Sequence, residues 1–194
     1  MNAATLAALS HLGDLRSAAL ESVQSKHKYP ALLLLYSFID VCAAVCDDGQ
    51  PKDNRGRFEA FLLKHASLTT WQSFTTYDLW AARSSLLHSF SPLGNHTKPG
   101  KSARPIFYFA WPETKDEVNE ALRQRGYSGY LLLDIETIKW LAVDCFNTMW
   151  RRVDNEPAFE QLIATNSRDL LRNLFQMKFE AELLLLEKLA SEPR

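Results

Sequence analysis

The sequence has few cysteines, no long apolar run and almost no net charge. Three cysteines stand among 194 residues, and 22 Lys and Arg nearly balance 23 Asp and Glu, which gives a formal charge of −1. Cys42, Cys46 and Cys145 have apolar neighbours, so we expect reduced core thiols rather than a disulfide framework. Cys42 and Cys46 share a helix face, but no nearby His or third Cys completes four ligands, and we expect neither a metal nor a cofactor.

The missing apolar runs and the balanced charge also limit location and partners. The longest apolar run, Ala31 to Leu35, is far shorter than the ~20 residues that span a bilayer. The first residues lack a basic region followed by an apolar stretch and a cleavage site. We therefore expect no membrane segment and a cytoplasmic location. Because the net charge attracts no nucleic acid from a distance, RNA binding would require a local basic patch.

The composition that is present is that of a globular protein. Hydrophobic residues make up 46% and charged residues 23% of the chain, which predicts one folded domain over residues 1–194. Apolar residues recur at helical spacing, with start and stop signals, over 4–26, 30–46, 54–65, 76–90, 115–125, 135–153 and 167–189. A shorter segment around 157–164 separates the last two of these. Residues 105–111 and 130–133 read as strands. We expect an all-α helical bundle with a loop and a small β-hairpin inserted over residues 91–133.

Arg83 and His88 stand near the end of the helix expected over residues 76–90, just before a loop rich in Gly and Pro. Residues five apart on a regular helix point about 140° away from each other, so a loosened helix end or a second subunit must bring them into one cleft. A histidine can exchange the protons of RNA cleavage while a guanidinium holds the phosphate. The pair therefore indicates metal-independent RNA cleavage. The alternative interpretation of Arg83 and His88 is a surface Arg and a His that caps the helix end.

The surroundings of this pair resemble the HEPN superfamily, whose motif is an Arg, four intervening residues and a His. Arg83 follows Trp80-Ala81-Ala82, and a buried helix with Tyr36-Ser37-Phe38-Ile39-Asp40 precedes it. The resemblance implies a bundle that dimerises around the motif helices, with endoribonuclease activity on single-stranded RNA. Toxin–antitoxin and phage-defence systems are common settings, with a cognate antitoxin or defence protein as partner. Carried over, Arg83 binds phosphate and His88 is the general acid and base.

Two positions depart from the HEPN pattern. Ser84 follows the Arg, where active members commonly have Asn, Asp or His. Phe90 stands where the toxin branch that is neutralised by nucleotidylation has a Tyr. The alternative function is therefore an inactive HEPN-like dimerisation module that binds a nucleotide, RNA or a protein.

Asp40 is an acidic residue inside an apolar helix, where an unpaired charge is costly. It either orients Arg83 or His88, with Tyr36 one turn away on the same face as a further supporting residue, or forms an ion pair that fixes helix packing. The sequence favours neither interpretation.

Basic residues follow the motif in the loop: Lys98, Lys101 and Arg104. They either guide an RNA backbone or belong to a solvated flexible loop. The other histidines are expected to face solvent: His11, His27, His65 and His96.

Overall fold

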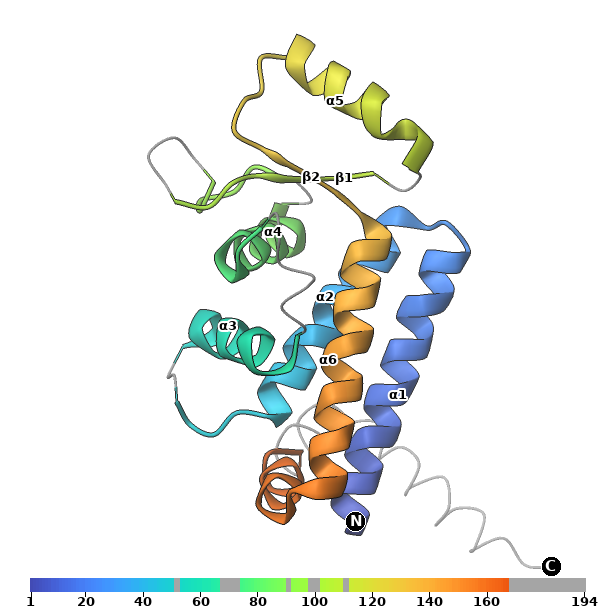
Figure 1. The fold of residues 1–194 in the computed structure, drawn as a ribbon, viewed down its shortest axis with the longest axis vertical. Coiled ribbons are helices and arrows are strands. Elements are labelled where there is room, and N and C mark those ends of the chain that lie inside the picture. Colours follow the sequence, from blue (N-terminus) through green and yellow to red (C-terminus); the bar gives the residue numbers. More distant parts are fainter. Residues whose placement is uncertain (51–52, 67–73, 90–91, 98–101, 110–111, 168–194) are drawn as a thin grey trace, which may run out of the picture.

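The described residues are mostly helical, with a small two-stranded sheet between the long helices and a short helix at one end of the molecule (Figure 1). A computed structural model describes residues 1–50, 53–66, 74–89, 92–97, 102–109 and 112–167, except for the side chains of residues 3, 88, 89 and 112. The predicted helical character is confirmed. The helix expected over 167–189 lies outside the described residues apart from Ser167, which is the last described residue of a helical stretch that begins at residue 157.

Three long helices form the body of the molecule: α1 (Ala3–Gln24), α2 (Lys28–Val45) and α6 (Ile135–Asn155). α2 packs against both of the others and against α3 (Asn54–His65), and it begins two residues before Pro30, the expected start. By length and composition α2 is apolar enough to cross a membrane, but half of it is buried inside the fold. Its role here is that of the central helix of a bundle.

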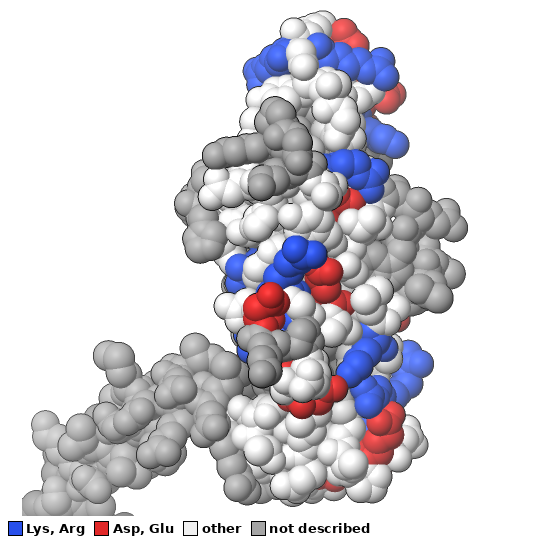
Figure 2. Space-filling model, turned by 90° about the vertical axis from the view of Figure 1, so that its left-hand side faces the viewer, with Lys and Arg blue, Asp and Glu red and all other residues white. Residues whose placement is uncertain are grey.

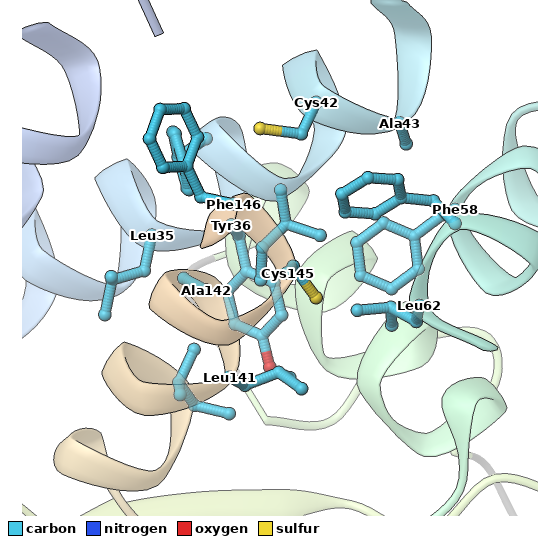
Figure 3. Packing of buried hydrophobic residues seen from close by; sticks show 14 of the residues in the cluster. Leu35, Tyr36, Cys42, Ala43, Phe58, Leu62, Leu141, Ala142, Cys145 and Phe146 are labelled. Carbon is cyan, nitrogen blue, oxygen red and sulfur yellow. The ribbon is translucent and has the colours of Figure 1, made fainter. Parts of the chain in front are cut away.

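Side chains of α2, α3 and α6 meet in the core that Figure 3 shows. The ring centroids of Phe38 and Phe146 lie 5.7 Å apart, and both rings are buried. Cys42 and Cys145 are buried free thiols in this core, as the sequence predicts. Burial of such apolar and aromatic side chains is the main source of the stability that holds α2 in place.

α3 and α4 (Thr76–Ser89) begin at polar caps. The side chain of Asp53 accepts a hydrogen bond from the Gly56 amide at 2.6 Å. The Thr75 hydroxyl accepts from the Asp78 amide at 3.1 Å, while the Asp78 carboxylate accepts from the Thr75 amide at 2.9 Å. This reciprocal capping box satisfies amides that a helix start leaves unpaired, and it confirms the expected start of α4.

The expected β-hairpin insertion over residues 91–133 is wrong. Strands β1 (Ile106–Phe109) and β2 (Leu131–Asp134) pair in parallel, with Ile106 opposite Leu131. The chain between them forms η2 (Pro112–Thr114) and α5 (Lys115–Gln124). Because α5 carries the chain back along the outer side of the sheet, β2 starts again at the same end as β1 (Figure 1). The inserted unit is therefore a β-α-β crossover.

Candidate functional site on α4

Arg83 lies on α4 and contacts Asp40 on α2. The Arg83 Nε donates a hydrogen bond to Asp40 Oδ2 at 2.6 Å, and its Nη2 forms an ion pair with the same oxygen. The guanidinium also lies over the Trp80 ring, with 4.9 Å from Cζ to the ring centroid. The two charged side chains are 20% and 23% exposed. The structure therefore brings together Asp40 and Arg83 at the border between core and solvent.

The environment of Asp40 is drier than that of a surface carboxylate. Burial raises the pKa of the Asp40 carboxyl, while the hydrogen bond and positive charge of Arg83, and the charge of Arg57, oppose that rise. Arg83 is thus the main counter-charge of a partly desolvated acid. Because the pair is partly desolvated, separating or removing either partner would leave the other charge without compensation.

Tyr36, the other expected supporting residue, points to the sheet. Its side chain is fully buried, and its hydroxyl is hydrogen-bonded to that of Tyr108 in β1. Their rings meet edge to face with centroids 6.4 Å apart. Burial raises the pKa of both hydroxyls well above the ordinary value, so neither is a ready proton donor at neutral pH. Tyr36 ties α2 to the sheet.

His88 lies on α4, and the position of its side chain is outside what the structure describes. The backbone remains α-helical through Ser89, so the helix does not loosen before that residue. Ser84, next to Arg83, is partly buried. On the loop after α4, Gly94 packs so closely on the buried Ser85 that a Cβ added there would lie 2.0 Å from the Ser85 Oγ.

Of the three basic loop residues, Lys98 and Lys101 lie outside the described residues, and Arg104 is held by Asp78. The Arg104 amide and its guanidinium each donate to the Asp78 carboxylate at 2.7 Å. Although burial opposes the charge of Asp78, hydrogen bonds from Arg104 and Thr75 keep its pKa below the ordinary value. Arg104 thus anchors the segment before β1 to the first turn of α4.

The structure contradicts the expectation that His65 faces solvent. Its side chain is 2% exposed and lies between the rings of Phe61 and Phe159, with centroids 4.8 and 5.8 Å away. Burial, together with the positive charges of Arg152 and Lys64, lowers the pKa of His65 to about 4. Its Nε2 lies 3.4 Å from the Arg152 guanidinium, which can only donate, so the imidazole accepts and is neutral.

The remaining expected histidines differ in exposure. His11 and His27 are exposed as predicted, whereas His96 is partly buried and its ring meets that of Tyr77 edge to face at 6.0 Å.

Sequence reasoning missed a pocket of about 390 Å³ between α2, α4, β1 and α5. Its lining residues come from these four elements and from the chain beside them, so no local sequence motif indicates the pocket. Among the described residues, no group of three or more His, Cys, Asp or Glu side chains is placed to hold a metal ion.

Charged side chains of both signs are interleaved around the middle of the face that Figure 2 shows.

Comparison of this chain with known protein families, with curated proteins and with solved structures finds no match.

Proposed function

We propose that the protein is a HEPN-type endoribonuclease that cleaves single-stranded RNA in the cytoplasm without a metal, with Arg83 and His88 as its catalytic pair. The observation that supports this proposal is the ion pair between Asp40 and Arg83. It holds a partly exposed guanidinium in a fixed orientation on the helix that also carries His88. Asp40 uses Nε and Nη2 of Arg83, so Nη1 stays outside the pair and is the group assigned to a phosphate oxygen.

In the proposed reaction, neutral His88 removes the proton from a ribose 2′-hydroxyl. The 2′-oxygen then attacks phosphorus while the bond to the 5′-oxygen breaks. That leaving oxygen takes a proton from an imidazolium, which gives a 2′,3′-cyclic phosphate and a 5′-hydroxyl. Arg83 stabilises the negative charge that grows on the nonbridging oxygens.

We further propose that two copies of the chain form the site around a two-fold axis. α4 remains helical through Ser89, and residues five apart on a regular helix point about 140° away from each other. A second α4 would place the Arg83 of one subunit near the His88 of the other, and two histidines would supply base and acid separately.

The test is incubation of the full chain with a fluorescent, unstructured RNA in the presence of a chelator. We expect cleavage to products with cyclic phosphate ends, which mass spectrometry identifies. His88→Ala should abolish cleavage, and Arg83→Gln should reduce its rate on the order of a hundredfold. Asp40→Asn, which removes the charge that orients Arg83, should reduce kcat/KM about tenfold. His11→Ala, on the exposed face of α1, is the matched histidine control and should cleave normally. If the RNA stays intact with an excess of the wild-type protein, the proposal that the protein is a ribonuclease is wrong.

A second candidate is the inactive module that binds RNA, a nucleotide or a protein through the same helix. It is favoured by Ser84 at the position after the Arg, where active HEPN members commonly have Asn, Asp or His. This candidate predicts that wild type binds the same RNA without cutting it, and that Arg83→Gln weakens binding. Gain of cleavage in Ser84→Asn would identify Ser84 as the cause of lost catalysis.

A further inference from the structure

The pocket beside α4 has the size and composition of a small-molecule site. Its volume is about 390 Å³, within the ~300–1,000 Å³ typical of ligand pockets. Leu32 of α2, Leu86 of α4, Ile106 of β1 and Leu122 of α5 contribute aliphatic walls. All four of these side chains are buried, so their positions are fixed by the surrounding core. The apolar part of the pocket is therefore preformed.

Aromatic rings form a second part of the pocket lining: Tyr29, Phe107, Tyr108 and Tyr127. Phe107 and Tyr127 meet edge to face with centroids 5.2 Å apart. Rings in such positions favour a flat aromatic ligand, which gains both from area burial and from ring contacts. A flexible chain would lose more conformational entropy on entering the same space.

The charged residues that line the pocket are both positive. Lys28 and Arg125 are its only ionic lining residues among the described ones, and no acidic side chain lines it. Lys28 is partly buried and donates through Nζ to the backbone carbonyl of Tyr108. Burial lowers the pKa of Lys28, because water no longer fully stabilises its charge. An anion in the pocket would restore that stabilisation.

Two further features would favour an anion at this end of the molecule. Lys28 and Tyr29 belong to the first turn of α2, where the helix dipole is positive and no side chain of the described residues caps the helix through a hydrogen bond. On the face that Figure 2 shows, basic side chains outnumber acidic ones at the end formed by α5, although the first turn of α5 itself is acidic.

We propose that this pocket binds a small aromatic carboxylate, with its ring between the aliphatic and aromatic walls and its carboxylate at Lys28 and Arg125. The site is separate from the proposed cleavage site, because α4 lines it with Ala82 and Leu86 whereas Arg83 is bound to Asp40. Failure of RNA cleavage would therefore leave this proposal untouched.

The test is calorimetric titration of the full chain with naphthoate and with its neutral counterpart naphthamide. We expect one molecule of naphthoate to bind per chain, and at least tenfold weaker binding of naphthamide. Adenosine monophosphate carries its anionic phosphate on a ribose that is joined to a polar base, and it should bind more weakly than naphthoate because the walls offer few partners for its polar edges. Equal binding of naphthamide would overturn the anionic part of the proposal, and equal or tighter binding of the nucleotide would overturn the apolar part.

Variants of α5 test the location. Ala121 is exposed on the helix and lines the pocket, so Ala121→Trp should fill the space and abolish naphthoate binding without disturbing the core. Arg125→Gln should weaken binding about tenfold. Arg123→Gln is the matched control, because Arg123 is exposed in the last turn of α5, two residues before Arg125, and does not line the pocket. Equal losses in both arginine variants, or full binding by Ala121→Trp with a native circular dichroism spectrum, would overturn the proposal.

Discussion

A single carboxylate, that of Asp78, joins the segment before α4, the first turn of α4 and the segment before β1. It is 1% exposed and accepts hydrogen bonds from the Thr75 amide and from the amide and guanidinium of Arg104. Asp78→Asn keeps the shape but replaces an acceptor oxygen with a donor. We expect a loss of unfolding free energy on the order of 2–4 kcal/mol, measured by urea denaturation at neutral pH.

Asp48 provides the matched control for that substitution. Its carboxylate pairs with Lys64 at 2.9 Å, but both side chains are well exposed, 43% and 54%. Asp48→Asn should therefore change the unfolding free energy by less than about 0.5 kcal/mol. Similar losses in the two variants would show that burial and the three-way bonding of Asp78 do not matter.

For Asp40 the sequence predicted the need for a charged partner, but for Tyr36 it did not predict the partner. Asp40 needed a partner because an isolated charge inside an apolar helix is costly, and Arg83 is that partner. Tyr36 shares the face of Asp40 by spacing, yet its hydroxyl pairs with Tyr108. That partner depends on the path of β1, and no local pattern in α2 contains this information. Helix periodicity predicts a shared face but not the element that covers it.

At the scale of elements, the loop after α4 is held to the helix by a close contact between Gly94 and Ser85. A Cβ on Gly94 would lie 2.0 Å from the Ser85 Oγ and 3.0 Å from its Cβ, and Ser85 is buried. Gly94→Ala must therefore displace the loop or the side chain. We expect a loss of about 1–3 kcal/mol in unfolding free energy, with the loop as the first segment to gain hydrogen exchange.

Gly13 on α1 provides a control in which the same substitution should raise stability. It lies in the middle of a helix, and an added Cβ would meet nothing within 4 Å. Gly13→Ala should raise the unfolding free energy by about 0.5–1 kcal/mol, since alanine loses less conformational entropy in a helix. A stable Gly94→Ala variant would contradict the close packing of the loop.

The strands of the sheet could be predicted from the sequence, but their relative direction could not. Both strands and the helix between them were predictable, because Pro105 to Trp111 and Tyr130 to Leu133 are rich in strand formers and Gly126 ends a helical pattern. The direction of β2 was not. A helix of 10 residues is long enough to return the chain to the starting end of β1, so the same elements produce a parallel pair. Direction depends on where α5 packs, which is a tertiary property.

At the scale of the whole molecule, the fold depends on a neutral His65 where α3, α6 and the helical stretch over 157–167 meet. The imidazole is 2% exposed, and burial together with the charges of Arg152 and Lys64 lowers its pKa to about 4, while Glu156 opposes that shift. In the unfolded chain its pKa returns to an ordinary value of about 6.5. Below about pH 6.5 the unfolded state binds a proton that the folded state does not bind. The contribution of neutral His65 to stability is therefore complete above about pH 6.5 and is lost as the pH falls toward 4.

We therefore expect the unfolding free energy to fall by about 2 kcal/mol between pH 7.5 and pH 5, measured by urea denaturation. His65→Phe keeps a ring between Phe61 and Phe159 and has no proton to gain, so most of this pH dependence should disappear. If that variant does not fold, His65→Gln serves the same purpose at lower stability. His11→Gln, on the exposed face of α1, should keep the wild-type dependence. Identical pH profiles for wild type and His65→Phe would show that the junction does not require a neutral imidazole.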